Sequence, residues 1–252
     1  DDEYVKRFLE VSQVKNYTDG LTEPNDFRAV NVVCSLEEMA FDFYVFGENV
    51  GRFKTTKLFG FYNIYNLLAV LSYFYLEGYP LDIIRSLVPK IKQVRGRFER
   101  VETDYPLHVF IDFAHTPKGV YKLLQEVKLI TSQPVITVIG CGGNRDRTKR
   151  PLIGKITTQL SDFTIFTDDN PRHEKSEQIL DEIVKGAVNN HFLTIPDRRE
   201  AIEFAIRFAK KGDLVLILGK GHETVQEIGG VTYPFDDYEE AKRAIEQRFM
   251  EE

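Results

Sequence analysis

From about residue 99 onward, short apolar runs alternate with helix-length amphipathic segments, and this alternation most constrains the possible folds of the chain. Several runs are continuously apolar, which is typical of strands covered on both faces. Regular β-α alternation predicts an α/β fold with a doubly wound, mostly parallel sheet. The expected strands are 98–102, 107–113, 134–140, 163–167, 192–195 and 214–218, and the expected helices are 117–130, 151–160, 176–188 and 199–210.

The boundaries of these elements carry further signals. Only residues 103–106 separate the first two strands, which is too short for a parallel crossover, so one of them should be antiparallel. Thr116 before Pro117 is typical of an N-cap followed by the first helical position. Ser176 is expected to cap the helix that follows it.

The first part of the chain has a different pattern. Helices are expected at 63–76 and 81–88, with Gly78 as a stop signal between them, and strands at 40–46 and 51–58. A turn at residues 95–97 follows these elements. We therefore expect two domains, residues 1–94 and 95–252.

Composition excludes several classes of protein. The 33 basic and 39 acidic residues give a net charge of −6. The mild acidity is distributed along the chain, which argues against a nucleic-acid partner. The longest apolar stretch, residues 67–76, is about half of the ~20 residues that span a bilayer, so no membrane insertion is expected. The two cysteines, Cys34 and Cys141, have no metal-type spacing and fit a cytoplasmic protein. The start at Asp1 shows no signal peptide and suggests a fragment.

Polar and glycine-rich segments follow five consecutive expected strands. In an open α/β sheet, ligands bind at the carboxyl ends of the strands, so these segments should share one edge. The opposite edge carries ordinary residues. The five segments are 112–117, 140–150, 168–173, 196–199 and 219–223.

The glycine-rich segment after the second parallel strand has two interpretations. Glycines 140, 142 and 143 could form only a tight turn. Four cations then precede a helix, whose N-terminus favours anions, and this favours an anion site. These cations are Arg145, Arg147, Lys149 and Arg150. The chain has no G-x-x-x-x-G-K-[ST] phosphate loop.

The segment after the third parallel strand could be only a turn before a helix, since Asn-Pro favours turns. Alternatively, Arg172 can bind a carboxylate at two points while Asn170 orients it. Glu223 could accept from an ammonium group, and the set would then bind the zwitterionic end of an amino acid. His115 and His222 could equally be structural.

Taken together, these segments resemble the Mur ligases, specifically the MurE type. The resemblance runs in family order through nearly the whole chain. It is carried by residues 60–66, 96–99, 112–117, 140–151, 167–172, 197–198 and 219–223. Folate polyglutamate synthetases resemble only 96–99 and 112–117, and lack a counterpart to 169–172.

The resemblance implies an ATP-dependent amide ligase of peptidoglycan precursor synthesis. Such an enzyme phosphorylates the terminal carboxylate of UDP-MurNAc-L-Ala-D-Glu with ATP and Mg²⁺, and the amine of meso-2,6-diaminopimelate attacks the acyl phosphate. It further implies that 1–94 is the back part of the central ATPase domain, and that 95–252 is the Rossmann-like, amino-acid-binding domain. A monomer is expected.

The resemblance also implies roles for individual residues. His115 and Lys149 would be catalytic, with His115 near the phosphates. Two larger sets follow. The residues expected to meet adenine and ribose are Asn63, Asn66, Arg97 and Asp112, and those expected to bind the amino acid are Arg145, Asp169, Asn170, Pro171, Arg172, Gly219 and Glu223.

The sequence also departs from the family pattern. Phe113 stands where the family commonly has Tyr. The Gly-Lys-Thr phosphate loop, the UDP-binding domain, the carbamylated lysine and most Mg²⁺ ligands have no counterpart, so no metal site is expected and the 252 residues should be catalytically incomplete. Three alternatives stay open: a non-catalytic module that binds a nucleotide or amino acid, a ligase that adds L-lysine or lanthionine, and a folylpolyglutamate-synthetase-like ligase.

Overall fold

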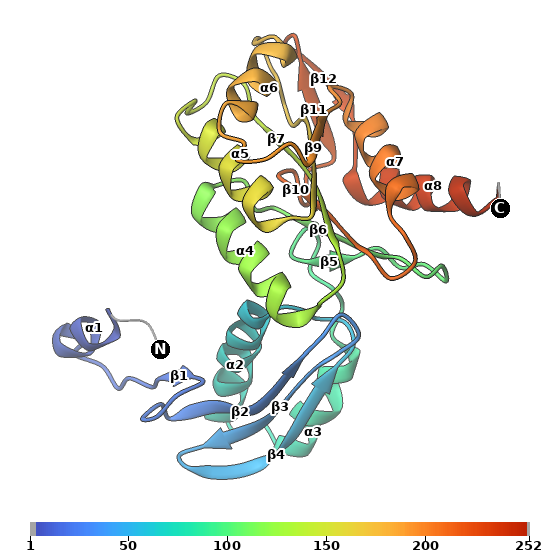
Figure 1. The fold of residues 1–252 in the computed structure, drawn as a ribbon. Helices are drawn as coiled ribbons and strands as arrows, with labels where there is room; N and C mark the ends of the chain where they lie inside the picture. Colours follow the sequence, from blue (N-terminus) through green and yellow to red (C-terminus); the bar gives the residue numbers. More distant parts are fainter. Residues whose placement is uncertain (1–3, 251–252) are drawn as a thin grey trace. The chain divides into compact units, whose positions relative to one another are not determined.

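The computed structural model describes residues 4–250. The chain divides into two compact units, the first ending at Lys92 and the second beginning at Gln93 (Figure 1). Each unit has its own hydrophobic core. We describe each by itself.

The second unit is built on a six-stranded sheet, as the β-α alternation predicts. The order β5-β6-β10-β7-β8-β9 is parallel throughout except for β5, which runs antiparallel to β6. The expectation of one antiparallel strand is therefore confirmed. The strands are β5 (Glu99–Arg100), β6 (His108–Asp112), β7 (Val135–Cys141), β8 (Phe163–Asp168), β9 (Phe192–Thr194) and β10 (Leu214–Leu218).

Helices cover both faces of this sheet. From β6 through β9 the chain advances in one direction, and it then returns to place β10 between β6 and β7. Right-handed crossovers therefore put the first three helices on one face and the fourth on the other, as Figure 1 shows. The helices are α4 (Pro117–Ile130), α5 (Lys149–Leu160) and α6 (Ser176–Val184) on one face, and α7 (Arg198–Phe208) and α8 (Asp237–Met250) on the other.

One of the two predicted caps is confirmed and one is wrong. Thr116 accepts a hydrogen bond from Gly119 N at the start of α4. Ser176 is already the first residue of α6, after Lys175. Its hydroxyl instead donates to Oδ2 of Asp168 at 2.5 Å, so it ties the helix to the end of β8.

A hairpin and a helix after β10 lie beyond the predicted elements. Strands β11 (Val225–Ile228) and β12 (Val231–Pro234) pair antiparallel, with Gly229 and Gly230 at positive φ between them. A double glycine is suited to such a turn because it adopts positive φ without strain. The helix α8 then packs beside α7.

The first unit contains a four-stranded sheet and helices. The predicted strand 51–58 is found three residues earlier as β4, and β2 was not predicted. Large aromatic residues fill the core, among them Phe27, Phe41 and Phe53. The elements are α1 (Val5–Val11), β1 (Asp19–Gly20), β2 (Phe27–Cys34), β3 (Met39–Val45), β4 (Glu48–Thr55), α2 (Phe61–Leu76), α3 (Leu81–Leu87) and a 3-10 turn at Val88–Lys90.

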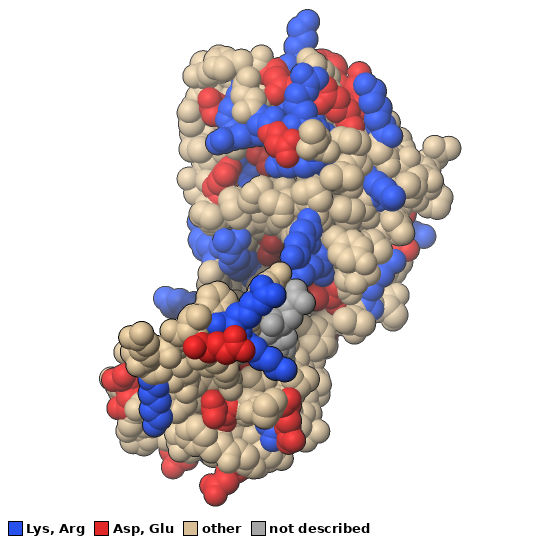
Figure 2. All heavy atoms as spheres, turned by 90° about the vertical axis from the view of Figure 1, so that its left-hand side faces the viewer, with Lys and Arg blue, Asp and Glu red and all other residues tan. Residues whose placement is uncertain are grey.

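Within residues 4–250, every helix is too short or too polar to cross a membrane. Figure 2 shows basic and acidic side chains interspersed on the visible face rather than gathered into one basic surface.

Candidate functional site

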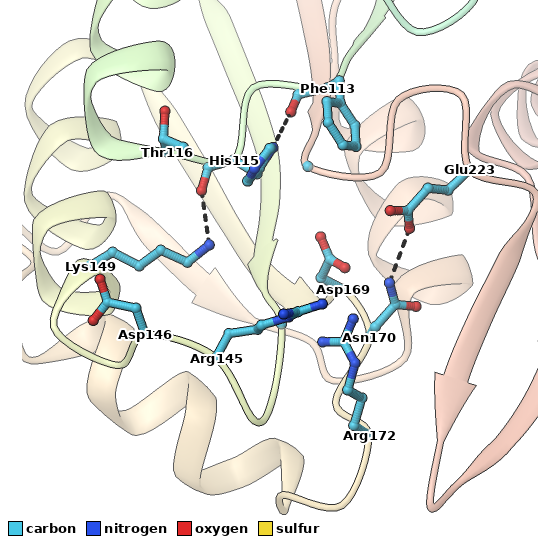
Figure 3. A pocket seen from close by; sticks show the side chains of 12 residues that line it. Phe113, His115, Thr116, Arg145, Asp146, Lys149, Asp169, Asn170, Arg172 and Glu223 are labelled. Carbon is cyan, nitrogen blue, oxygen red and sulfur yellow. Dashed lines mark hydrogen bonds between the residues drawn. The ribbon is translucent and has the colours of Figure 1, made fainter.

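A cavity of about 480 Å³ opens at the carboxyl edge of the second unit's sheet. Its walls come from the segments that follow β6, β7, β8 and β10, which are four of the five segments predicted from the strand ends (Figure 3). The fifth, 196–199 after β9, contributes no residue to the wall. Because β10 lies between β6 and β7, connections to both faces diverge beside it, and ligands bind at such a point. The lining residues are Phe113, His115, Thr116, Gly142, Arg145, Asp146, Lys149, Asp169, Asn170, Arg172, Gly219 and Glu223.

Most of the predicted amino-acid-binding and catalytic residues line this cavity. Pro171 is the exception, since it does not line the cavity wall. Arg97 and Asp112 belong to the same unit but do not line the cavity, and Asn63 and Asn66 lie on α2 of the first unit. The predicted residues found in the wall are His115, Arg145, Lys149, Asp169, Asn170, Arg172, Gly219 and Glu223.

The loop after β7 packs directly on the loop after β8. The N–H of Gly143 donates to the carbonyl of Asn170 at 2.8 Å. A Cβ at position 143 would lie 1.9 Å from the Pro171 carbonyl oxygen, so only glycine allows this approach. The glycine-rich segment therefore shapes the loop after β8 in addition to forming a turn.

Two of the four cations in that segment pair with carboxylates and do not line the cavity. Arg150 is 0% exposed and donates to Glu174, Glu182 and the carbonyl of Gly142. Arg147 pairs with Glu182. The prediction of a four-cation anion site is therefore corrected to two cavity cations, Arg145 and Lys149, because the other two guanidinium groups hold structural ion pairs.

Asn170 bonds to Glu223, whereas the sequence led us to expect that its side chain would orient the carboxylate bound by Arg172. Nδ2 of Asn170 donates to Oε2 of Glu223 at 3.0 Å (Figure 3). The amide oxygen of Asn170 accepts from Glu227 N at 3.0 Å and from Lys220 Nζ at 3.1 Å. These two donors fix which end of the amide faces Glu223, since an oxygen accepts and an NH₂ donates.

Burial of Glu223 acts against its charged form, but hydrogen bonds and neighbouring cations outweigh it. Desolvation raises the pKa, whereas the bond from Asn170, the charge of Lys220 and the charge of Arg172 lower it, and the net shift is downward. Glu223 is therefore held as a carboxylate at neutral pH. An ionised carboxylate in a half-enclosed cavity is suited to an ammonium group.

Arg172 presents one edge of its guanidinium to the cavity. Its Nε donates to Oε2 of Glu227 at 3.1 Å, and Nη1 donates to the Gly143 carbonyl at 2.8 Å. Within residues 4–250, Nη2 makes no hydrogen bond. The Nη1–Nη2 edge therefore keeps N–H groups that can bind a carboxylate at two points. Arg172 has a φ of 54°, held by main-chain bonds to Glu227 and Gly229.

His115 and Lys149 lie together on the opposite wall of the cavity. Nζ of Lys149 donates to the carbonyl of His115 at 3.1 Å. Nδ1 of His115 lies 2.7 Å from the carbonyl of Phe113, and because a carbonyl only accepts, that nitrogen carries a proton. This leaves Nε2 of His115 and further N–H groups of Lys149 for a ligand.

Asp112 and Arg97 have local structural partners. The two carboxylate oxygens of Asp112 accept from the main-chain N–H groups of Phe98 and Ala114, both at 2.8 Å. The guanidinium of Arg97 lies over the Phe113 ring, 5.1 Å from its centroid. In the first unit, Asn63 is buried and donates to the Phe59 carbonyl. Their expected contacts with adenine and ribose stay a prediction.

The cavity fits a multiply charged anion better than a metal ion. The described residues contain no group of three or more His, Cys, Asp or Glu side chains that could hold a metal. We therefore assign no step through a metal. Lys149 and Arg145 instead offer N–H groups, which suit phosphate oxygens.

Three residues of this site were missed by the sequence argument. Lys220 is 0% exposed and contacts both Asn170 and Glu223. Gln226 donates to the carbonyl of Asp169 at 2.9 Å, and Glu227 contacts Arg172. Lys220 lies between two glycines within the segment 219–223, whereas the hairpin residues gave no signal apart from the double glycine at the turn.

Comparisons with known proteins bear on the whole chain. A family profile described as "Mur ligase, glutamate ligase domain" matches residues 96–221. The UDP-N-acetylmuramoyl-L-alanyl-D-glutamate--2,6-diaminopimelate ligase of Halalkalibacterium halodurans is 39% identical over 249 residues, 99% of this chain and 51% of that protein. The ligase of the same name from Bacillus velezensis is 40% identical over 245 residues, 97% of this chain and 50% of that protein.

A solved structure of a ligase with this name is also similar. It has a TM-score of 0.71 at 33% identity and covers 98% of this chain and 52% of that one. The chain therefore spans about half the length of the relatives it matches.

Proposed function

Because the chain belongs to the Mur ligase family, as the C-terminal half of the MurE type, we propose that it supplies the amino-acid-binding domain of an ATP-dependent amide ligase. The full-length protein would add meso-2,6-diaminopimelate to UDP-MurNAc-L-Ala-D-Glu. It would act in the cytoplasm, on peptidoglycan precursors. Residues 93–252 would bind the incoming amino acid, and the first unit would belong to the ATP-binding domain.

One observation carries this proposal: the cavity holds a carboxylate-binding edge and an ammonium-binding carboxylate on neighbouring loops. Arg172 offers its Nη1–Nη2 edge from the loop after β8. Glu223 offers an ionised carboxylate from the loop after β10, with Asn170 bonded to it. An amino acid carries both complementary charges, and the two points together fix its orientation.

The choice of a diamino dicarboxylic acid over lysine rests on Arg172. Diaminopimelate has a second carboxylate, distant from the reacting amine, whereas lysine has only an ammonium group at that position. The guanidinium of Arg172 would repel that ammonium group, so lysine should bind poorly. Lanthionine carries the same two carboxylates, so it would compete with diaminopimelate rather than be excluded.

The wall formed by His115, Arg145 and Lys149 would meet the phosphates of ATP and the developing negative charge. When bound, ATP supplies a phosphoryl group that turns the substrate carboxylate into a better electrophile. Fixed N–H donors in the wall would stabilise the negative charge that moves onto phosphate oxygens. Lys149 is oriented for this by its bond to the His115 carbonyl.

The test is ATP-dependent ligation by the full-length protein. Phosphate release and product mass are measured with UDP-MurNAc-L-Ala-D-Glu and, separately, meso-diaminopimelate, lanthionine, L-lysine or no amino acid. We expect product with diaminopimelate and none with lysine. Product with lysine alone would overturn the role given to Arg172. Absence of both product and phosphate release with every amino acid would favour a binding module.

A folate control separates the remaining alternative. Folylpolyglutamate synthetases act on glutamate and a folate, so dihydrofolate and glutamate are added in place of the two substrates. Turnover with this pair would contradict the proposal. We expect none, because the site joins two charged loops around Asn170 and Arg172.

A further inference from the structure

Lys220 lies behind the two loops that carry the amino-acid site. It follows β10 by two residues, and no part of it is exposed. Its Nζ donates to Oδ1 of Asn170 at 3.1 Å, to Oε2 of Glu223 at 3.1 Å and to the carbonyl of Val225 at 2.6 Å. A lysine ammonium has three N–H groups, so all of them are used within the protein. Lys220 therefore has no donor left for a substrate.

The three acceptors of Lys220 belong to three different segments. Asn170 lies in the loop after β8, Glu223 in the loop after β10, and Val225 begins the hairpin. One buried cation thus connects every element that shapes the ammonium end of the cavity. A buried charge is costly unless it is fully paired, so the positions of its partners are tightly constrained.

The bonds of Lys220 also decide how its partners face the cavity. Oε2 of Glu223 is engaged by both Lys220 and Asn170. Within the described residues, Oε1 of Glu223 accepts no hydrogen bond, and the side chain points toward the cavity in Figure 3. Because Lys220 donates to the amide oxygen of Asn170, the NH₂ of Asn170 must face Glu223.

We propose that Lys220 is a positioning residue for the amino acid, which acts through Asn170 and Glu223 and leaves Oε1 of Glu223 free for the substrate ammonium. This inference rests on the proposed function, since it assigns the ammonium of the incoming amino acid to Glu223. It goes further by naming a residue that never touches substrate yet sets the affinity for one substrate only.

Replacement of Lys220 by methionine keeps the length of the side chain and removes its charge. We expect Lys220→Met to raise the KM for diaminopimelate by about 10- to 100-fold, as charge-assisted hydrogen bonds are lost. The KM values for ATP and for UDP-MurNAc-L-Ala-D-Glu should change less than about 2-fold, because Lys220 does not line the cavity wall that would meet them. Lys155→Met, on the exposed side of α5, is the matched control and should leave all three unchanged.

A double-mutant cycle distinguishes positioning from general damage. If Lys220 acts through Glu223, Lys220→Met should add little to the KM of a Glu223→Gln variant, because contacting residues are not additive. Additive effects, or an equal rise in all three KM values, would overturn the proposal. If Lys220→Met does not fold, as judged by thermal unfolding, Lys220→Gln keeps two N–H donors and is tested in the same cycle.

The pH dependence gives an independent readout. Loss of the Lys220 charge should raise the pKa of Glu223, so the ratio of variant to wild-type KM should grow as pH falls toward the ordinary titration range of a glutamate, about 4–5. The charge of Arg172 also lowers the pKa of Glu223. Arg198 interacts with Glu223, Asp169 lines the same cavity and Glu227 pairs with Arg172, and all four residues are unchanged in the variant. A ratio that is flat with pH would contradict the proposal. Absence of turnover by the wild-type protein would instead refute the proposed function.

Discussion

Arg198, at the start of α7, and Asp237, at the start of α8, form an ion pair that is closed off from solvent. Nε and Nη2 of Arg198 donate to the two carboxylate oxygens of Asp237, both at 2.8 Å, and each side chain is 0% exposed. The same guanidinium donates to the carbonyls of Asp168 and Leu218. It therefore holds the ends of β8 and β10, from which the site loops begin.

Loss of one partner of this pair should strongly lower the free energy of unfolding. Arg198→Met leaves Asp237 as a buried, unpaired charge and frees two strand-end carbonyls, and such a change costs about 3–5 kcal/mol. Thermal and urea unfolding of the variant should show this loss. Arg199→Met is the control, because Arg199 forms an exposed ion pair with Glu240.

The double variant Arg198→Met/Asp237→Leu separates pairing from packing. It should recover much of the stability lost by Arg198→Met, since the unpaired charge is then absent. A double variant as unstable as the sum of the single variants would show that the carbonyl bonds matter more than the ion pair.

Arg172 should govern affinity for the distal carboxylate. Removal of its guanidinium edge in Arg172→Ala should raise the KM for diaminopimelate by about 10- to 100-fold, from a lost charge-assisted bond of roughly 1.5–3 kcal/mol. Steady-state kinetics of the full-length protein measure this. Arg147→Ala removes a guanidinium that pairs with Glu182 outside the cavity and should leave that KM unchanged. An unchanged KM in Arg172→Ala would contradict the proposal that Arg172 binds the distal carboxylate.

Much of the sheet was predictable because its signals are local. Continuous apolar runs such as Leu214–Leu218 are fully buried in the structure, and the short link before β6 correctly predicted an antiparallel edge. Helix starts were less predictable. Thr116 caps its helix as expected, whereas Ser176 turns toward Asp168, a residue eight positions earlier, and this tertiary bond replaces the local one.

The loop residues of the candidate site could be predicted from sequence, but the buried residues that hold these loops could not. Strand ends of a parallel sheet meet at one edge, so Asp169, Arg172 and Glu223 could be grouped from sequence. The pairing of Arg150 with Glu174 and Glu182 could not, because it joins segments 24 and 32 residues apart. The burial of Lys220 could not be predicted either, since a lysine between glycines is normally expected to be exposed.

Asp168 should make stability depend on pH. Burial is the main cause that raises the pKa of Asp168 to about 6, and Oδ1 is buried without a hydrogen-bond partner in residues 4–250. The native state thus keeps a proton that the unfolded chain releases near pH 3.8. Between these values the native state binds more protons, so this group lowers the free energy of unfolding as pH rises.

Asp168→Asn removes this titration. The urea midpoint of the variant, minus that of the wild type, should increase as pH is raised from about 4 to about 7. Asp181→Asn, at an exposed position of α6, should keep the wild-type profile. Parallel curves for Asp168→Asn and wild type would show that burial does not hold a proton on Asp168.

Gly143 offers a test of the contact between the loops after β7 and β8. In Gly143→Ala the new Cβ would meet the Pro171 carbonyl oxygen at 1.9 Å, and backbone rather than a flexible side chain must move. Overpacking of this kind costs about 1–3 kcal/mol, and the shift would also displace the Gly143 carbonyl that accepts from Arg172. We therefore expect a lower unfolding temperature together with a raised KM for diaminopimelate. A Gly143→Ala protein with native kinetics would mean that the loops separate without consequence for binding.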